Sequence, residues 1–431
     1  MKYPAINSAL FTENRKRFTQ QMKPGSVAIF NSNDVMPHNG DGHFYFRQNS
    51  DFFYLTGIDQ EKSVLLLAPD CPNEDYREVL FVIETNETLA TWEGHKYTKE
   101  EATAASGIKK VVWTSGFDTI LHYVVLHSQN IYLNLNENDR SSYAVPYFDL
   151  RFTHKLKDSY PLHDYYRSAP IMAELRAIKS QPEIDLLSQA ISITEKAFRR
   201  LLTFVKPGVM EYEIEAEIIH EFTRNRANGH AYEPIIASGG SACVLHYIEN
   251  NKPCKDGDLL LMDFGACYAN YNADLTRCIP VNGKFSPRQR AVYDAVLRVH
   301  RQAKDLMTPG KSLFELNKQA GFIMQEELLG LGLITKEDVA KATPEKTAFH
   351  KYYPHGIGHF LGLDVHDIGD RFTEIKPGNV FTCEPGIYIN AENLGIRIEN
   401  NLVVTAGKPI DLMANIPIEA DEIEDLMQSG K

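Results

Sequence analysis

A pattern that occurs twice in the second half of the chain constrains its fold more than any other feature. Each copy consists of two amphipathic helix signals, an apolar strand and a shared signature of Gly, five residues, an acid, one residue and Gly. The signature covers residues 257–265 in one copy and 378–386 in the other. A histidine precedes each signature glycine, His246 by 11 residues and His366 by 12. Four matches in the same order predict a duplicated unit, two αα-strand halves related by a pseudo-twofold axis.

The helices of this unit have recognisable ends. Ser180 and Glu183 form a capping box, and Pro182 falls in the first turn. The predicted helices are one capped by Ser180 and stopped at 206–208, one over 211–228, one opened by Ser286-Pro287 and closed at 308–310, and one over 312–329. The pseudo-twofold axis would bring the two signature acids, Asp263 and Glu384, face to face at the centre of the domain.

The first 170 residues alternate between strand and helix signals. Apolar, β-rich runs predict strands at 26–31, 63–69, 77–83, 109–114 and 130–135, and helix-like stretches cover 98–106 and 117–128. This alternation predicts an α/β domain with a mixed or parallel sheet. Residues 141–170 are rich in Tyr, Asp and His and lack clear periodicity. We therefore place the domain boundary there, with a first domain over 1–172 and a second over 173–431.

Composition excludes several classes of protein and partner. The 431 residues are 43% hydrophobic and 24% charged, which argues against disordered and fibrous classes. Asp and Glu outnumber Lys and Arg by 57 to 45, a formal charge of −12 that makes nucleic acid and anionic membranes poor partners. The sequence shows neither a signal-peptide core nor an 18-residue apolar run, so we expect a cytoplasmic protein. Six scattered cysteines without a CxxC pair predict buried, reduced thiols.

Four acidic residues stand at the ends of predicted strands. Asp263 closes the apolar run 259–262, and a buried carboxylate must be paired or bound to a metal. Asp274 follows eleven residues later, after a polar turn, as expected for a hairpin that returns to the same place. Glu384 ends the second apolar strand. Glu399 follows in an alternating strand, on the same face as Arg397.

Two histidines four residues apart, His355 and His359, add imidazole to this set. The glycines between them permit close backbone approach and argue against a helix, so the HExxH zinc motif does not apply. A single acid after an apolar run is more often a cap or turn residue than a ligand, and HxxxH alone is a weak signal. Four acids and one histidine at strand ends, spread over two matching halves, point instead to a metal centre.

The composition of this set predicts the chemistry. Four carboxylates balance two divalent cations and leave room for one bridging hydroxide. Oxygen-rich ligands with one imidazole suit Mn²⁺, or Fe²⁺ and Co²⁺, better than a thiolate-preferring metal. Two metals about 3.5–4 Å apart would clamp a water, lower its pKa and polarise a carbonyl. The residues therefore predict metal-assisted hydrolysis.

Residues 176–410 resemble the pita-bread metallopeptidases, the family of methionine aminopeptidase, prolidase and aminopeptidase P. The motifs that carry the resemblance are 244–247 (VLHY), the DFG-type Asp263, 274–277 (DLTR), 355–359 (HGIGH), 363–367 (LDVHD), 382–388 (TCEPGIY) and 397–399 (RIE). Residues 46–57 and 91–94 also resemble the N-terminal half of aminopeptidase P. The resemblance implies an α/β N-terminal domain followed by an α+β pita-bread (creatinase/aminopeptidase-like) catalytic domain with pseudo-twofold duplication.

The resemblance also implies an activity and a metal centre. The activity is that of an Xaa-Pro aminopeptidase, which hydrolyses the bond between an N-terminal residue and a following proline by a metal-bridging hydroxide. Two divalent ions are implied, Mn²⁺ foremost. Asp263 would chelate one metal, and His359 and Glu384 the other. Asp274 and Glu399 would bridge the pair, and Glu384 would also act as general base toward the bridging water.

Further residues match positions around the substrate. The matching histidines, which would orient the peptide and stabilise the oxyanion or shuttle a proton, are His246, His355 and His366. Tyr388 and Arg397 match positions that face the substrate or support the ligands. Asp41 and Trp92 resemble residues that reach a neighbouring subunit's active site, which implies a homodimer or homotetramer acting on peptides. Alone, these two are typical of a turn residue and a packed surface aromatic.

Other functions fit less well. Prolidase takes only Xaa-Pro dipeptides through the same metal centre; Trp92 and the segment 46–57 favour aminopeptidase P, although some prolidases carry similar first domains. The large first domain disfavours methionine aminopeptidase. A metal-free binding scaffold or a creatinase-like amidinohydrolase would lack several of the five ligand positions, and all five are filled here.

Overall fold

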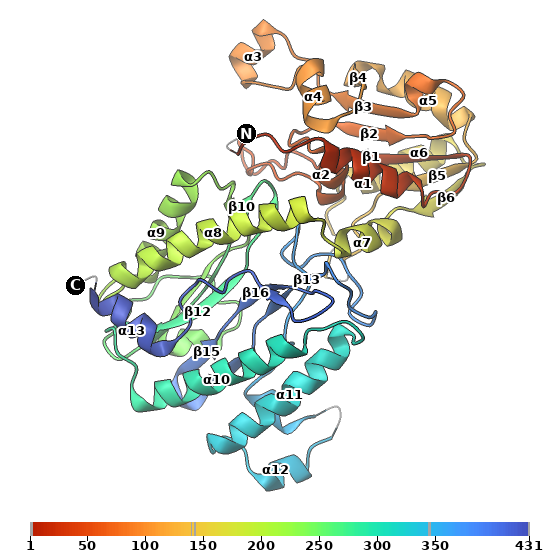
Figure 1. The fold of residues 1–431 in the computed structure, drawn as a ribbon. Helices are drawn as coiled ribbons and strands as arrows, with labels where there is room; N and C mark the ends of the chain where they lie inside the picture. Colours follow the sequence, from red (N-terminus) through yellow and green to blue (C-terminus); the bar gives the residue numbers. More distant parts are fainter. Residues whose placement is uncertain (1–2, 139, 142–143, 344–345, 430–431) are drawn as a thin grey trace. The chain divides into compact units, whose positions relative to one another are not determined.

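The computed structural model describes residues 3–138, 140–141, 144–343 and 346–429. The chain divides into two compact units, the first ending at Arg176 and the second beginning at Ala177 (Figure 1). The boundary predicted near residue 172 falls within helix α7 (Ala169–Ala177). Among the described residues, no helix is both long and apolar enough to cross a membrane.

The first unit is built on a six-stranded mixed sheet in the order β4-β3-β2-β1-β5-β6. Its strands are β1 (Ser26–Asn31), β2 (Val64–Leu67), β3 (Glu78–Val82), β4 (Lys110–Trp113), β5 (Asn130–Leu133) and β6 (Asp164–Arg167). β2 runs antiparallel to β1 and β3. The other pairs are parallel: β4 with β3, β5 with β1, and β6 with β5. The five strands predicted from the sequence are confirmed, and the sheet is of the mixed kind.

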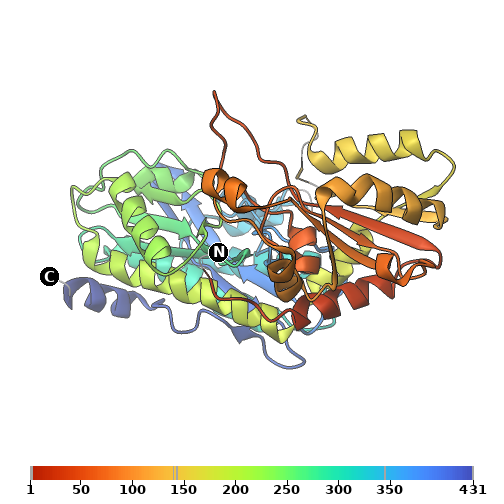
Figure 2. The same cartoon turned by 90° about the horizontal axis from the view of Figure 1, so that it is seen from above.

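Helices cover both faces of this sheet because its strands are apolar on both sides. They are α1 (Ala9–Thr19), α2 (Ser50–Thr56), α3 (Glu87–Glu93), α4 (Lys99–Ser106), α5 (Phe117–Leu126) and α6 (Phe148–Ser159), with short 3₁₀ turns η1 (Glu74–Tyr76) and η2 (Thr114–Gly116). On one face Phe18 of α1 packs edge-on against Phe30 of β1, with ring centroids 5.1 Å apart. On the other, α5 and α6 lie side by side (Figure 2) and share a core with Val27 and Ile29.

Residues 141–170 lack clear periodicity and carried no predicted helix or strand, but α6 and β6 form there. In α6, Phe152 and Leu156 are one turn apart and buried in the sheet core, but the rest of the helix is mostly polar. β6 is a polar edge strand, paired with β5 on one side only. Neither element has the full apolar periodicity that sequence analysis relies on.

The first half of the second unit begins with the two predicted helices. It contains α8 (Gln181–Phe204), α9 (Glu211–Arg224), β7 (Gly229–His230), β8 (Ile235–Ser238), η3 (Gly239–Cys243), β9 (Leu259–Phe264), β10 (Ala266–Tyr268), β11 (Tyr271–Asn272) and β12 (Leu275–Pro280). The capping box of Ser180 and Glu183 is present. α9 ends four residues before the predicted Asn228, because Arg226 takes a left-handed φ of 70° that a helix does not tolerate.

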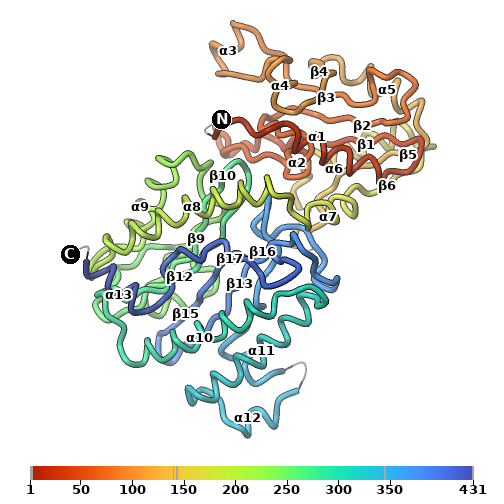
Figure 3. Tube along the Cα trace, viewed as in Figure 1, coloured from red at the N-terminus to blue at the C-terminus, as the bar shows by residue number. Residues whose placement is uncertain are grey.

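The second half also begins with a pair of long helices and continues with strands. It contains α10 (Pro287–Leu306), α11 (Leu313–Gly330), α12 (Lys336–Ala340), η4 (Ala348–Lys351), β13 (Val380–Cys383), β14 (Gly386–Ile389), η5 (Asn390–Glu392), β15 (Leu394–Arg397), β16 (Asn400–Val403), β17 (Ile410–Asp411) and α13 (Ala420–Ser429). Figure 3 shows the pair α8 and α9 on one side of the strands and the pair α10 and α11 on the other. α8 contacts β10 and β11, α9 contacts β8, and α10 contacts β13, β14 and β15. The predicted helix pairs are thus confirmed, and each leads to antiparallel strands.

Strand register brings the ends of these strands together. β9 lies between β8 and β12, and within it Asp263 is opposite Ile235 on one side and Thr276 on the other. In the second half, Cys383 at the end of β13 is opposite Asn400 at the start of β16. Glu384 therefore follows β13 at the point where Glu399 precedes β16. The backbone of Glu399 donates a hydrogen bond to Thr276 O at 3.1 Å, which joins the two halves.

Candidate metal centre

The four acids predicted from strand ends lie in one cluster with His359, in which Asp274 and Glu399 are buried and the other members are partly buried. The ligand atoms of Asp274, His359 and Glu399 all lie within 4.8 Å of one another. His359 Nε2 is 3.4 Å from Asp274 Oδ2 and 3.6 Å from Glu384 Oε1. Asp263 is joined to Asp274 through a shared hydrogen-bond donor. The structure thus brings all five predicted metal ligands together.

The imidazole of His359 has a defined orientation. Its Nδ1 is 2.9 Å from the carbonyl oxygen of Phe360, so Nδ1–H donates there and Nε2 faces the carboxylates. The backbone N–H of His359 donates to Thr382 Oγ1 at 3.1 Å. A Cβ on Gly358 would lie 2.1 Å from the backbone oxygen of Thr382, so only glycine allows the chain to pass β13 this closely. The sequence-based expectation of close backbone approach is confirmed at Gly358.

Tyr232, which the sequence analysis missed, lies between two of the acids. Its hydroxyl is 2.5 Å from Asp263 Oδ1 and 2.5 Å from Asp274 Oδ1. A phenol has one hydroxyl hydrogen, so Tyr232 can donate to only one of the two carboxylates at a time. The other carboxylate then lacks a donor from Tyr232. Tyr232 shows no motif of its own. It lies three residues before Ile235, and only the pairing of Ile235 with Asp263 places it here.

A second hydrogen-bonded chain runs from Asp263 to the first histidine of the HxxxH pair. Arg397 donates from Nη2 to Asp263 Oδ2 at 2.6 Å and from Nη1 to the Tyr388 hydroxyl at 2.9 Å. That hydroxyl is 2.9 Å from His355 Nε2, and His355 Nδ1 is 2.9 Å from the carbonyl oxygen of Gly356. Each group in this chain can donate to the next: Arg397 Nη1–H to the Tyr388 oxygen, the Tyr388 O–H to His355 Nε2, and His355 Nδ1–H to the Gly356 carbonyl oxygen. This chain holds His355 as a neutral imidazole.

Thr276 lies in the DLTR motif but was not predicted to have a role of its own. Its hydroxyl donates to Glu399 Oε2 at 2.7 Å and accepts from Arg397 Nε at 3.1 Å. Thr276 is fully buried. It belongs to the DLTR motif, but its role depends on β12 lying between β9 and the Glu399 segment. Asp263, Glu399 and Arg397 are therefore held in one network.

The acids lack sufficient positive charge in this structure. Burial raises the pKa of Asp263, against the opposing effect of Arg397, and burial with Asp274 and Glu384 raises the pKa of Glu399 well above its usual value. Burial also raises the pKa of Glu384 to about 7, although His359 and Arg397 oppose it. Several carboxylates in a water-poor pocket destabilise one another's ionised forms. A bound cation would relieve this.

The pKa values of His355 and His359 are shifted in opposite directions by their surroundings. Burial lowers the pKa of His359, but the hydrogen bond to Asp274 and the charge of Glu384 outweigh it and raise the pKa to about 9. Burial and the nearby Arg397 lower the pKa of His355 to about 4. His359 is thus the imidazole that faces negative charge, which suits a metal ligand.

The residues present fit a divalent cation. The donor set is four carboxylates and one imidazole, an oxygen-rich set of the kind that binds Mn²⁺ and similar ions. The Nδ1–H of His359 is already committed to a carbonyl, as is usual for a metal-binding histidine. Arg397 and His359 are basic side chains that contact three of these four carboxylates, so a bound cation would supply the remaining positive charge.

The remaining predicted residues lie on exposed segments. His366 is exposed, and its ring lies edge-on to His359 with centroids 4.3 Å apart. His246 is exposed, and its charge contributes to lowering the pKa of His355, after burial and Arg397. Asp41 and Trp92 belong to the first unit. Asp41 is exposed in a turn, and Trp92 is 86% exposed in α3.

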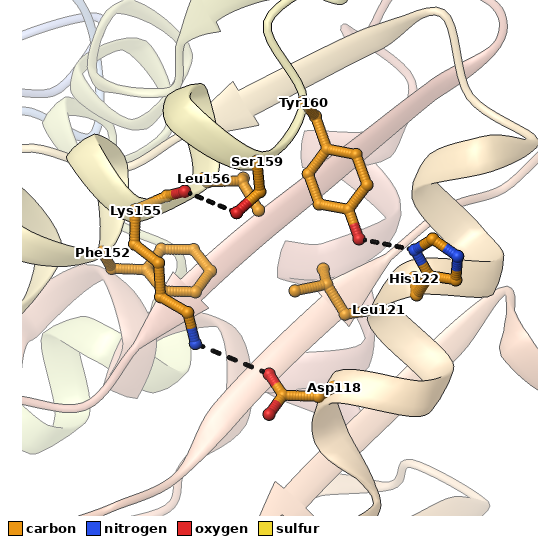
Figure 4. A pocket seen from close by; sticks show the side chains of 8 residues that line it. All are labelled: Asp118, Leu121, His122, Phe152, Lys155, Leu156, Ser159 and Tyr160. Atoms are coloured by element: carbon orange, nitrogen blue, oxygen red, sulfur yellow. Dashed lines mark hydrogen bonds and ion pairs between the residues drawn. The ribbon is translucent and has the colours of Figure 1, made fainter.

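A separate pocket of about 240 Å³ lies between α5 and α6 in the first unit (Figure 4). Its polar side chains pair with one another: Lys155 lies 3.7 Å from Asp118, and His122 Nδ1 lies 2.8 Å from the Tyr160 hydroxyl. None of the twelve predicted site residues lines it.

Comparison with known proteins places this geometry in a family. The model of metallopeptidase family M24 matches residues 185–406, and the model of the aminopeptidase P N-terminal domain matches residues 11–132. The chain therefore belongs to the M24 metallopeptidases and carries the N-terminal domain of aminopeptidase P. This confirms the predicted two-domain architecture and the pita-bread fold of the second domain.

Individual relatives cover nearly the whole chain. It is 36% identical to a Xaa-Pro aminopeptidase of Haemophilus influenzae, over 97% of this chain and 96% of the relative. Among solved structures, Pseudomonas aeruginosa aminopeptidase PepP superimposes with a TM-score of 0.90 at 31% identity, covering 99% of both chains. A Zn-substituted Escherichia coli aminopeptidase P in complex with product has a TM-score of 0.87 at 32% identity, covering 99% of this chain and 100% of that one.

Proposed function

We propose that the chain is a metal-dependent Xaa-Pro aminopeptidase, which hydrolyses the peptide bond between an N-terminal residue and a following proline. The observation that carries the proposal is the convergence of four acids and His359 at the meeting point of the two halves. The aminopeptidase P N-terminal domain and the full-length similarity to a Xaa-Pro aminopeptidase support the choice of substrate.

Two divalent ions are part of the proposal, with Mn²⁺ as the preferred metal because the donors are oxygen-rich. Asp263 would hold one ion, His359 and Glu384 the other, and Asp274 and Glu399 would contact both. When bound, such ions lower the pKa of a water and polarise the carbonyl that it attacks. Tyr232 and Thr276 support the set by fixing the carboxylate oxygens that they contact.

Glu384 is the proposed general base. It accepts the proton of the attacking water, and the Thr382 hydroxyl, 3.4 Å from Oε1, donates a hydrogen bond that orients it. Both ring nitrogens of His355 already have partners in the chain from Arg397. We therefore assign direct peptide contact to the exposed His246 and His366, and to His355 a fixed ring beside the base.

The proposal includes assembly as a homodimer or homotetramer, in which Asp41 and Trp92 reach a neighbouring subunit's site. Three large side chains of the first unit support it, because Trp92, Phe44 and Tyr45 are strongly exposed and so available for contact with another subunit. We also propose a cytoplasmic location, supported by the free thiols of all six cysteines.

The test is hydrolysis of an Xaa-Pro-Xaa tripeptide beside an Xaa-Pro dipeptide, each with EDTA and with added Mn²⁺. We expect metal-dependent release of the first residue from the tripeptide, and loss of turnover in Glu384→Gln. Cleavage of the dipeptide alone would identify a prolidase instead. Absence of cleavage with either substrate, in the presence of Mn²⁺, would refute a peptidase function.

A further inference from the structure

The loop that carries His246 is joined to a helix by buried polar groups that the proposed mechanism does not use. His246 is exposed, whereas the next residue, Tyr247, is only 4% exposed. Leu245 and His246 lie in a turn that leads directly into Tyr247, so fixing Tyr247 limits the directions in which the adjoining His246 can project. What holds Tyr247 therefore bears on the substrate site.

Glu211, the first residue of α9, holds Tyr247. Its side chain is fully buried, and its carboxylate accepts three hydrogen bonds. Oε1 accepts from the backbone N–H of Ser238 at 2.9 Å; Oε2 accepts from the Tyr247 hydroxyl at 2.8 Å and from the backbone N–H of Lys252 at 2.9 Å. A buried carboxylate is costly unless its oxygens are satisfied, and here three donors satisfy it. One side chain thus joins the end of β8, the residue after His246 and the end of the loop.

A second carboxylate on α9 ties the same loop one turn further along. Glu215 Oε2 accepts from Asn250 Nδ2 at 3.0 Å, and the same amide nitrogen donates to Pro234 O at 2.9 Å. Asn250 Oδ1 accepts from the backbone N–H of Ile236 at 3.0 Å, and Asn250 itself has a left-handed φ of 44°. The loop is therefore anchored at 247, 250 and 252, while the side chains around His246 stay exposed.

The exposed part of the loop has the character of a contact surface. Val244 is 55% exposed and Ile248 49% exposed, so apolar side chains lie on both sides of His246 in the sequence. Behind them, η3 packs closely on β15: a Cβ on Gly395 would lie 2.2 Å from the backbone oxygen of Ala242. β15 ends at Arg397, which contacts Asp263. The loop is thus fixed at its base to the metal-centre strands and at its end to α9.

We propose that Glu211 is a positioning residue for the substrate: through Tyr247 it orients His246, and its loss weakens peptide binding while leaving the metal centre assembled. This inference rests on the proposed aminopeptidase function. Among the described residues, no hydrogen bond joins Glu211 directly to any of the five proposed metal ligands, so its effect passes through the loop and the end of β8.

The deciding experiment is a double-mutant cycle between Glu211→Gln and His246→Ala, measured as kcat/KM on an Xaa-Pro-Xaa tripeptide with Mn²⁺. Gln keeps the size of the side chain but loses one acceptor oxygen. Hydrogen bonds to a charged group predict a loss of about 10-fold in kcat/KM, mostly through KM, for Glu211→Gln alone. In the His246→Ala background the same substitution should cost less than about 2-fold, because interacting sites are not additive.

The matched control is Glu213→Gln, which removes the same charge from the same helical turn. Glu213 accepts from the backbone N–H of Met210 at 2.7 Å and is exposed, so its substitution should leave KM unchanged. A readout independent of activity is hydrogen exchange in the metal-free protein. The amides of Ser238 and Lys252 should exchange faster in Glu211→Gln and at the wild-type rate in Glu213→Gln.

An equal cost of Glu211→Gln in both backgrounds would overturn the inference, and so would an unchanged KM with unchanged exchange. If Glu211→Gln does not fold, Tyr247→Phe takes its place, because it removes one of the three hydrogen bonds to Glu211. The same double-mutant cycle with His246→Ala then tests the inference. A wild-type protein that cleaves the tripeptide keeps the proposed function even when the cycle is additive. A wild-type protein that does not cleave it refutes the function, while the exchange data still test the anchoring.

Discussion

His300 should make the second unit sensitive to acid, and replacing it should remove that sensitivity. The side chain is buried in α10, and neither ring nitrogen has a hydrogen-bond partner among the described residues. Burial lowers the pKa of His300 to about 3, with further contributions from Arg277, Lys304 and Arg301. The folded protein therefore holds this imidazole neutral, whereas the unfolded chain takes up a proton near its ordinary pKa of 6.5.

The sign and size of the effect follow from linkage. Because the folded pKa is lowered, the stability contribution is complete above pH 6.5 and is lost as the pH falls toward 3. Each pH step below 6.5 costs about 1.4 kcal/mol, so this one group should remove about 2 kcal/mol of the free energy of unfolding between pH 8 and pH 5. At pH 6 the loss should be about 0.8 kcal/mol.

The assay compares wild type with His300→Leu, an apolar side chain of similar size, in urea at pH 8, 6 and 5 with EDTA present. Far-UV circular dichroism follows the whole chain. Tryptophan fluorescence follows the first unit alone, because both tryptophans, Trp92 and Trp113, lie there. We expect the free energy of unfolding of His300→Leu to be no lower than that of wild type at pH 8. At pH 5 the difference between the two proteins should have shifted by about 2 kcal/mol in favour of His300→Leu.

The control is His220→Leu, which replaces an exposed histidine of α9. Its stability difference from wild type should not depend on pH in the same way. If wild type and His300→Leu lose stability in parallel between pH 8 and pH 5, the reasoning about His300 is refuted.

Three further predictions concern the buried ion pair, the metal centre and the first unit. Lys179 Nζ lies 2.8 Å from Asp367 Oδ2 with both side chains 1% exposed, so Lys179→Met should lower the stability of the second unit by about 3–5 kcal/mol in urea unfolding; a loss below about 1 kcal/mol would contradict the burial argument. Tyr232→Phe removes the hydroxyl shared by two acids and should weaken metal binding about 10- to 100-fold in a chelator competition, whereas unchanged affinity would show that the hydroxyl does not support the ligands. Trp92→Ala should slow hydrolysis of longer peptides more than that of tripeptides, and equal losses on both would exclude its proposed role at a neighbouring site.

Local signals in the sequence were sufficient for most of the elements. The capping box at Ser180 and the start signal Ser286-Pro287 placed two long helices correctly, because each signal lies within the first turn of its helix. Apolar runs placed five strands of the first sheet for a similar reason. α6 and β6 were missed because their stability comes from packing on the sheet and pairing with β5 rather than from their own pattern. The end of α9 was also missed, since the left-handed Arg226 has no marker in the sequence.

The sequence by itself determined which acids and histidines stand at strand ends and that they occur in two matching halves, since a strand end and a repeated signature are local patterns. Only the tertiary structure decided which neighbours these residues have. Tyr232 contacts Asp274 across 42 residues, Thr276 contacts Glu399 across 123, and Glu211 holds Tyr247 across 36. Such contacts depend on strand register and helix packing, where a shift of one residue turns a side chain to the opposite face of a strand. Hydrogen bonds between distant segments therefore complete the site that the local pattern begins.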